Sequence, residues 1–312
     1  MWLFKVFESK SPFVGLGKLG TQLNLNTETV GSINIAIPPP KEMSRILARL
    51  SRETERIDAL VEKKTRFIEL LREKRQTLIT HAITKGLNPT VTMKDSGADW
   101  LGDVPGHWVV KRLKFIASVQ TGVAKGKDNA GRQTIEVPYL RVANVQDGYL
   151  DLGDIATIEI PSNDLERYRL QPGDVLMNEG GDFDKLGRGH VWQGEIDPCI
   201  HQNHVFAVRP RGVSSAWLNA FTGTSAAQFY FMGRSKQSTN LASISSTNVM
   251  ELPVPVPSSQ EQEKILAYLD RETARLDTLV QKTKGSIALL KERRAALITA
   301  AVTGQIDLRE AA

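Results

Sequence analysis

Two stretches of the chain carry apolar residues at alternating spacings of three and four, a pattern typical of long helices that pack along a seam. In residues 46–84 the seam runs from Leu47 to Leu78, and in residues 265–303 it runs from Leu266 to Leu297. The pattern predicts that the two helices pack together as an antiparallel coiled coil. The side chains expected at their interface are Leu50, Ile57, Val61, Ile68, Leu71, Leu78, Leu269, Leu276, Val280, Ile287, Leu290 and Leu297.

The two helical stretches are copies of each other. They align without a gap at an offset of 219 residues, and the match continues upstream, where residues 32–42 lie opposite 251–261. Polar residues interrupt the seam at equivalent places, Thr54, Lys64 and Arg75 in one copy and Thr273, Thr283 and Arg294 in the other. Such polar layers are expected to fix the register of the pair. Prolines before each copy and glycines near each end predict helices within 38–85 and 257–304.

A mixed domain is predicted between the helices. Residues 86–99 have the Gly, Pro, Ser and Asp content of a linker, and residues 100–256 have the length of a globular domain. Runs at 137–145, 174–179, 189–193 and 204–209 predict strands, with turns at 172–174 and 180–182, and residues 216–232 predict a helix. The fold class is therefore α+β, a mixed α/β domain flanked by two long helices, with a tail at 305–312.

Composition adds constraints on where the chain works. An apolar fraction of 41% and a charged fraction of 24% are ordinary for a globular protein. No apolar run is long enough to span a bilayer, and the first residues lack the pattern of a secretory signal, so a cytoplasmic location is expected. Cys199 is the only cysteine, which makes an internal disulfide impossible, and we interpret it as core filler rather than as a nucleophile.

The placement of charge is more informative than the net charge of +5. Residues 107–146 hold seven Lys or Arg, Lys111, Arg112, Lys114, Lys125, Lys127, Arg132 and Arg141, against two acids, Asp128 and Glu136. An excess of five positive charges is enough to engage phosphates if the side chains share a face. A solvated run of charges is the alternative, and the charges by themselves leave both open.

Several motifs together resemble those of a known family. These are the segment 93–114, which contains DWLGDVPGHW, the helix opening PVPVPSSQEQEKI (253–265), and the runs YLRVANVQDGYLD (139–151), GDVLMNEGGDFDKLGRGHVW (173–192) and HQNHVFAVRP (201–210). They resemble the specificity subunit of type I restriction-modification systems. In that family two target recognition domains alternate with two long helices, each domain reads one half of a split DNA site, and the helix pair sets the gap between the halves.

The resemblance places 100–256 as a target recognition domain and 1–37 as the remnant of another. Leu25 and Val30 lie opposite Ile244 and Val249, whereas roughly 120 residues of that first domain have no counterpart, so we expect an N-terminally truncated first domain. It further implies a chain without catalytic activity or cofactor, whose partners are double-stranded DNA, two methyltransferase (modification) subunits and, through them, restriction/translocase subunits. S-adenosylmethionine, ATP and Mg²⁺ are expected on the partners. To read both halves of a split site, a truncated chain is expected to associate with a second copy or with another fragment of a specificity subunit.

Three loops offer side chains that match base edges or phosphates, namely residues 121–133, 181–190 and 233–240. In the second loop, glycine backbone amides with Lys185 and Arg188 suggest a phosphate contact. Gln202 and Asn203 fit adenine reading or a structural role equally well. The complete set of expected DNA-binding residues is Lys125, Lys127, Asn129, Arg132, Gln133, Arg141, Lys185, Arg188, Gln202, Asn203, Lys236 and Gln237.

Two other motifs suggest nucleotide or metal binding instead of DNA recognition. GLGKLG (15–20) satisfies a dinucleotide-binding pattern, but the sequence after it does not predict the required helix. Cys199, His201 and His204 have a spacing that suggests zinc, yet strand alternation separates His204 from the other two and a fourth ligand is missing, so no metal is expected. Two other functions remain open, a coiled-coil adaptor that binds protein without DNA specificity, and the recognition half of a system whose methylase and nuclease are fused.

Overall fold

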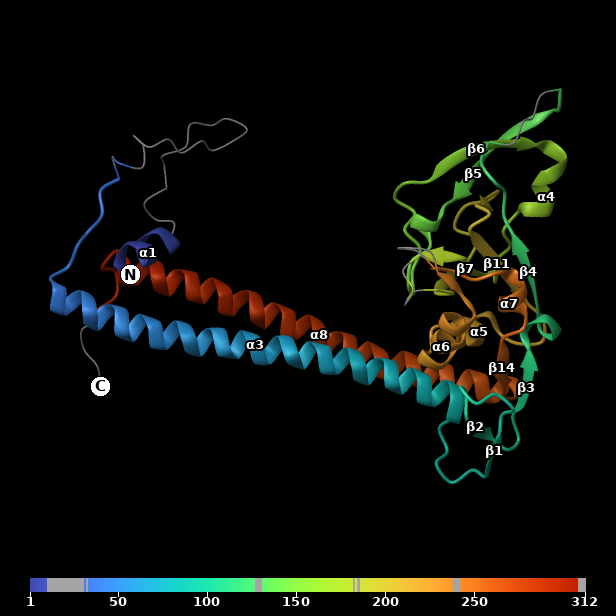
Figure 1. Cartoon of the computed structure of the whole chain (residues 1–312), viewed down its shortest axis with the longest axis horizontal. Coiled ribbons are helices and arrows are strands. Elements are labelled where there is room, and N and C mark those ends of the chain that lie inside the picture. Colours follow the sequence, from blue (N-terminus) through green and yellow to red (C-terminus); the bar gives the residue numbers. More distant parts are fainter. Residues whose placement is uncertain are drawn as a thin grey trace. The chain divides into compact units, whose positions relative to one another are not determined.

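The computed structural model describes residues 1–9, 31, 33–126, 131–181, 183, 186–237 and 242–307. It divides into two compact units, unit 1 (Met1–Glu73 and Arg275–Ala312) and unit 2 (Lys74–Ala274). Two long helices, α3 (Pro40–Lys85) and α8 (Ser259–Val302), contribute to both units. The predicted fold class, two long helices flanking a mixed α/β domain, is confirmed (Figure 1). No helix within the described ranges is long and apolar enough to cross a membrane.

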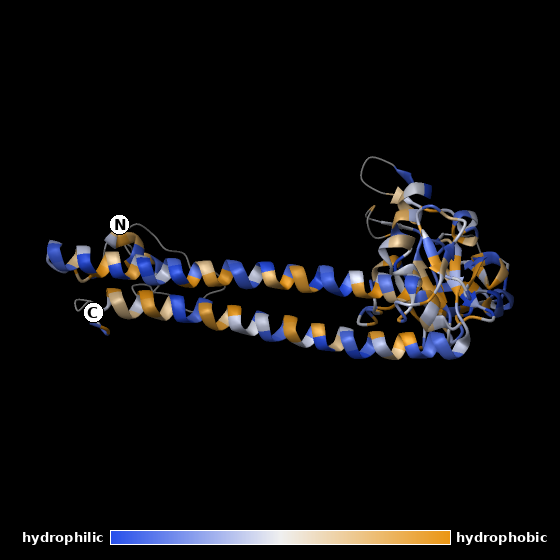
Figure 2. Cartoon of the chain, turned by 90° about the horizontal axis from the view of Figure 1, so that it is seen from below, coloured by the Kyte–Doolittle hydropathy of each residue, from blue (hydrophilic) through white to orange (hydrophobic). Residues whose placement is uncertain are grey.

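In unit 1, α3 and α8 lie side by side and run in opposite directions (Figures 1 and 2). Apolar residues recur along both helices with hydrophilic residues between them, as Figure 2 shows in orange and blue. Leu50, Ile57, Ile68, Leu71 and Leu276 are buried in this unit. The other expected interface residues of unit 1 are half-buried, namely Val61, Val280, Ile287, Leu290 and Leu297.

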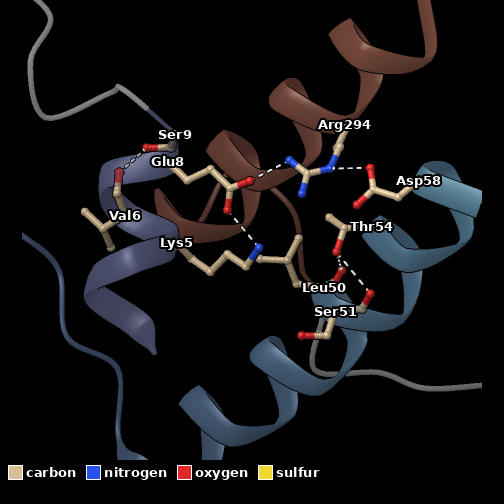
Figure 3. A network of polar contacts seen from close by, with 9 residues as sticks. All are labelled: Lys5, Val6, Glu8, Ser9, Leu50, Ser51, Thr54, Asp58 and Arg294. Carbon is tan, nitrogen blue, oxygen red and sulfur yellow. Dashed lines mark hydrogen bonds and ion pairs between the residues drawn. The ribbon is translucent and has the colours of Figure 1, made fainter. Parts of the chain in front are cut away.

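The polar residues of the seam form two kinds of contact, within one helix or between the two helices. Thr54 and Thr283 are buried, but each hydroxyl donates to a carbonyl of its own helix, that of Leu50 at 2.9 Å and that of Leu279 at 2.8 Å. Arg294 instead reaches the other helix, with its Nε 2.8 Å from Asp58 Oδ1 (Figure 3). A threonine bonded within its own helix carries no information about register, so in unit 1 the arginine layer links the helices.

A short helix, α1 (Trp2–Glu8), packs on the helix pair of unit 1. The Trp2 indole Nε1 donates to the Ala36 carbonyl at 2.9 Å. Glu8 accepts hydrogen bonds from Lys5 and from Arg294 (Figure 3); burial opposes the charged carboxylate, yet these bonds hold its pKa below the ordinary value. The apolar cluster beneath α1 contains Trp2, Val6, Ile46, Leu50, Ile298, Ala301 and Val302.

The described residues of unit 2 form five small sheets. The largest is antiparallel, in the order β4 (Ala117–Thr121), β11 (Val205–Pro210), β7 (Val175–Asn178) and β9 (Gly189–Val191). A second sheet orders β10 (Ile200–His201), β5 (Thr134–Leu140) and β6 (Ala156–Pro161), with β10 parallel to β5. A ribbon orders β12 (Lys236–Gln237), β13 (Ala242–Ser243) and β8 (Gly180–Gly181). The two remaining pairs are β1 (Met93–Asp95) with β2 (Asp103–Pro105) and β3 (Val109–Arg112) with β14 (Pro253–Val256).

Short helices connect these strands. They are the 3-10 turns η2 (Leu113–Phe115), η3 (Val142–Asn144) and η4 (Ser162–Asp164), and the α-helices α4 (Leu165–Tyr168), α5 (Ser215–Thr222), α6 (Ser225–Arg234) and α7 (Ser246–Met250). The main core of unit 2 includes Trp108, Phe206 and Trp217, and the helix residues Ile83 and Ile265 join it. Unit 2 therefore extends on both sides of residues 100–256, because the ends of α3 and α8 share its core.

Three local expectations differ from the structure. The single helix expected at 216–232 is two helices, because the Thr224 side chain accepts from the Ala227 amide and caps a new first turn. The turn expected at 180–182 begins as strand β8, which pairs with β13. The linker 86–99 contains β1, which pairs with residues beyond it.

Helix α1 repeats the role that α5 plays in unit 2. The Trp217 indole donates to the Pro255 carbonyl at 2.8 Å, and Pro255 is the repeat counterpart of Ala36, 219 residues on. Thr80 contacts Ser225 just after α5, while its counterpart Thr299 donates to Ser9 at the end of α1. The apolar residues correspond as well: Ile46, Leu50, Ala301 and Val302 match Ile265, Leu269, Ala82 and Ile83 of the unit 2 core.

Candidate functional site

A pocket of about 480 Å³ opens beside the end of β7 in unit 2. The ribbon β8–β13–β12 lines the pocket together with Val142 from η3, Glu179 after β7 and His204 just before β11. The ribbon supplies two residues from the predicted set, Lys236 and Gln237, both exposed. The nine lining residues are Val142, Glu179, Gly180, Gly181, His204, Lys236, Gln237, Ala242 and Ser243.

A linked polar group borders this pocket. His204 Nδ1 lies 2.7 Å from Glu179 Oε2, and Asn203 Nδ2 lies 3.3 Å from His204 Nε2. Because an amide nitrogen only donates, His204 Nε2 is the acceptor and its proton sits on Nδ1, from which it is donated to Glu179. The imidazole is thereby held between the Asn203 amide and the Glu179 carboxylate.

Gln202 and Asn203 lie next to the first predicted loop. The Val123 amide donates to the His201 carbonyl at 2.8 Å, and the Asn203 amide donates to the Val123 carbonyl at 3.1 Å. Gln202 Oε1 accepts from the Val142 amide at 3.4 Å, so part of this side chain serves the fold while its amide nitrogen keeps its donor capacity. Exposed Lys125 follows in the same loop.

The other predicted residues do not all gather here. Arg132 and Gln133 line a separate pocket with Ser162–Asp164 at the opposite end of β5. Arg141 lies 2.8 Å from Asp154, and Arg188 lies 3.2 Å from Asp147, so both guanidinium groups already have acidic partners. Lys127, Asn129 and Lys185 lie outside the described residues. Lys236 and Gln237 therefore line the pocket, and Gln202 and Asn203 contact its lining through Val142 and His204. Arg132 and Gln133 lie at a different pocket.

The loop that carries Arg188 is anchored by packing. Leu186 is fully buried, and Gly187 has a φ of +70°, a conformation that glycine adopts without strain. A Cβ at Gly187 would lie 2.4 Å from Phe231 Cε2, so the position also lacks room for a side chain. The packing of Leu186 and Gly187 therefore holds the backbone in place directly before Arg188.

The residues of the zinc-like spacing are dispersed. Cys199 is fully buried in an apolar cluster with Leu140 and Trp192, and burial raises the pKa of its thiol to about 12. His201 is buried as well, whereas His204 is exposed and bonded to Glu179. Among the described residues, no three His, Cys, Asp or Glu side chains form a group that could hold a metal. GLGKLG (15–20) falls outside the described residues.

Glu179 and His204 were not among the predicted site residues. Arg, Lys, Asn and Gln make the commonest contacts with guanine and adenine, so sequence alone favours these residue types as base readers. An acid at the end of the run DVLMNE carries no such signal, because its pairing with His204 depends on the contact between β7 and β11. The one available hint was that both residues lie in runs that carried the family resemblance.

Comparison with known proteins defines the class. Residues 105–288, which contain the whole pocket and the strands around it, match the model of the type I restriction modification DNA specificity domain. The match covers more than half of the chain. The chain belongs to this family.

Individual relatives agree with that assignment. The chain is 24% identical over 293 residues to the type I restriction enzyme EcoKI specificity subunit of Escherichia coli strain K12, which covers 91% of this chain and 60% of that protein. It is 25% identical over 172 residues to the putative type I restriction enzyme MjaX specificity subunit of Methanocaldococcus jannaschii, covering 54% of this chain and 40% of the relative. The chain thus spans about half the length of the curated relatives it matches.

Solved structures share the fold. A chain from a structure described as "Structural basis underlying complex assembly and conformational transition of the type I R-M system" has a TM-score of 0.72 at 19% identity, covering 98% of this chain and 71% of that chain. The crystal structure of the HsdS subunit from Thermoanaerobacter tengcongensis has a TM-score of 0.56 at 20% identity, covering 98% and 70%.

Proposed function

We propose that this chain is a sequence-specific DNA-recognition subunit of a type I restriction-modification enzyme and has no catalytic activity of its own. The observation that carries the proposal is a pocket lined by Lys236 and Gln237, inside the span that matches a DNA specificity domain. Two further predicted residues, Gln202 and Asn203, contact the lining residues Val142 and His204. Amide and ammonium groups of this kind read base edges and contact phosphates. The subunit acts in the cytoplasm and directs partner subunits to a bipartite DNA site.

The chemistry of the reaction belongs to the partners in this proposal. Methyltransferase (modification) subunits bind S-adenosylmethionine, restriction/translocase subunits use ATP and Mg²⁺, and this chain binds none of them. Purified chain with S-adenosylmethionine is expected to leave DNA unmethylated, and addition of the cognate modification subunit is expected to start methylation. Methylation by the chain alone would contradict the proposal.

The DNA contacts are tested through salt dependence. Alanine at Lys125, Lys127, Arg132, Lys185 and Arg188 together is expected to weaken binding to all duplexes and to lower the slope of log affinity against log salt by about 0.9 per lost phosphate contact. Fluorescence anisotropy across a salt series measures both quantities. An unchanged slope and affinity would place the phosphate-contacting face elsewhere.

Association with a second copy completes the proposed function. Unit 1 exposes large apolar side chains beside its helix pair, Met1, Leu3, Phe4, Phe7 and Ile37. A second copy that covers this surface brings two recognition domains into one particle, as a bipartite site requires. Light scattering of the chain and of a Leu3→Glu, Phe4→Glu variant tests this, because the variant is expected to be monomeric.

A further inference from the structure

The backbone around Glu179 is held on two sides. Its amide donates to the His204 carbonyl at 2.9 Å, and its carbonyl accepts from the Ile244 amide at 2.9 Å. The side chain therefore starts from a fixed position between β11 and the segment that follows β13. It is half-buried and lines the pocket described above. A carboxylate held in this way is positioned before any ligand arrives.

The charge of Glu179 stands out among its neighbours. Among the described residues that line the pocket it is the only acid, while Lys236 and Gln237 on the same pocket are donors. The His204 Nδ1 proton occupies one acceptor position of Oε2, and an ionised carboxylate has about four such positions on its two oxygens. Acceptor capacity is thus left over on a side chain that the imidazole holds in place.

The composition of the wall restricts what this acceptor can bind. Gly181 has open space where a Cβ would lie, which leaves its backbone open to close approach, and Val142 and Ala242 contribute only small apolar surfaces. A phosphate is repelled by the carboxylate, whereas an amino group on a base edge is attracted. In the major groove, the exocyclic amino groups are N4 of cytosine and N6 of adenine, and carboxylates accept from such donors.

We propose that Glu179 is a specificity-determining residue that accepts a hydrogen bond from the exocyclic amino group of a cytosine or adenine, and that His204 is the residue that positions it. The inference rests on the proposed function, because it presumes that this domain reads DNA. It assigns the pocket to one base pair of the recognised half-site and gives Lys236 the different task of contacting a neighbouring phosphate.

The experiment selects binding sites from a randomised duplex library with the full chain and with Glu179→Gln. The substitution keeps the size of the side chain but replaces one acceptor oxygen by a donor. We expect the preference at one base pair to fall by roughly 5- to 150-fold, with the other positions and the salt slope unchanged. Glu179→Asp is expected to favour the same base with a smaller ratio.

Two controls make the result specific. Glu166→Gln changes an exposed acid on α4 and is expected to leave every base preference unchanged. Lys236→Ala is expected to weaken binding to all sequences alike and to lower the salt slope. Circular dichroism melting confirms that each variant is folded.

Each outcome of the Glu179→Gln selection either supports or overturns the inference. A preference lost or altered at a single position supports the inference. If folded Glu179→Gln binds with unchanged preferences, or loses affinity equally for all sequences, Glu179 does not read a base and the inference is overturned while the proposed function stands. If the unaltered chain selects no sequence, both fail.

Discussion

The imidazole of His201 in β10 is fully buried, with Nδ1 2.7 Å from the Val205 carbonyl. Burial disfavours the charged ring and lowers the pKa of His201 below its ordinary value, although the hydrogen bond to Val205 acts in the opposite direction. A histidine of the unfolded chain takes up a proton near pH 6.5, while His201 in the fold stays neutral to lower pH. Below about pH 6.5 the unfolded state therefore binds more protons, and stability falls as pH falls.

From this linkage we predict that the free energy of unfolding of unit 2 falls by about 1 to 1.5 kcal/mol between pH 7.5 and pH 5.5. His201→Asn retains a donor for the Val205 carbonyl but cannot titrate, so the variant should lose this part of the pH dependence. Urea denaturation of both proteins at the two pH values measures the difference. Identical pH dependence in the two proteins would show that His201 is not the responsible group.

Single residues were predictable from sequence to different degrees. Cys199 was expected to be core filler and is buried in an apolar cluster, because a lone thiol in an apolar strand has few other places to go. Glu179 was missed, because its importance arises from His204, which lies 25 residues further along the chain. Arg141 was grouped with DNA-binding residues from local charge, and the structure gives it Asp154 as a partner.

Trp2 in α1 and Trp217 in α5 donate to carbonyls at equivalent positions of the repeat, so substitutions of the two residues can be compared directly. We predict that Trp2→Phe and Trp217→Phe each cost about 1 kcal/mol, since each removes one indole hydrogen bond and keeps most of the apolar surface. Hydrogen exchange locates each effect. For Trp2→Phe, faster exchange is expected in α1 and at Ile46–Leu50, with α5 unaffected, and the reverse is expected for Trp217→Phe. Faster exchange in both regions for either variant would contradict separate anchoring.

Elements with a strong periodic pattern were predictable, and elements held only by pairing were not. The seam of α3 and α8 repeats over many turns, so its period is visible in the sequence alone. The strands β8, β10, β12 and β13 contain two residues each, too few to show alternation, and they form because other strands present hydrogen-bonding partners. Since the candidate pocket is lined by three of them, its wall could not be derived from local pattern.

At the scale of the whole molecule, exposed leucines on the long helices recur with the repeat. Leu60 and Leu279 are equivalent, as are Leu70 and Leu289, and all four are exposed outside the seam. We interpret them as two copies of one docking site for two modification subunits. Leu60→Glu or Leu279→Glu alone should reduce the bound modification subunits from two to one, and the double variant should bind none. Native mass spectrometry counts the subunits.

Phe67 provides a control for the number of bound modification subunits. Phe67 is exposed on the same helix as Leu60, but its repeat counterpart is Ser286, so it belongs to no repeated site. Phe67→Ser should therefore retain two subunits. Loss of a subunit in this variant, or retention of both in the leucine double variant, would refute the docking sites.

The helix pair is also expected to set the spacing between half-sites in an assembled reader. Insertion of seven residues at matched points of α3 and α8 preserves the seam and lengthens the pair by about 10 Å, equivalent to about three base pairs of DNA. We predict that the non-specific spacer in the methylated site grows by that amount, as read by long-read sequencing of modified bases. An active protein with an unchanged spacer would show that the helices have no measuring role.

The correspondence between α1 and α5 bears on how such proteins diversify. Helices α1 and α5 both pack on the long helices, although their sequences share little beyond Trp2–Leu3 and Trp217–Leu218. The residues that follow, Phe4-Lys5-Val6 and Asn219-Ala220-Phe221, are unlike. Both segments are attached through an indole that donates to a backbone carbonyl and through apolar helix residues at equivalent positions of the repeat. Segments that keep these contacts are therefore expected to be interchangeable between the two ends of the helix pair, which gives a repeated scaffold a route to new combinations of attached domains.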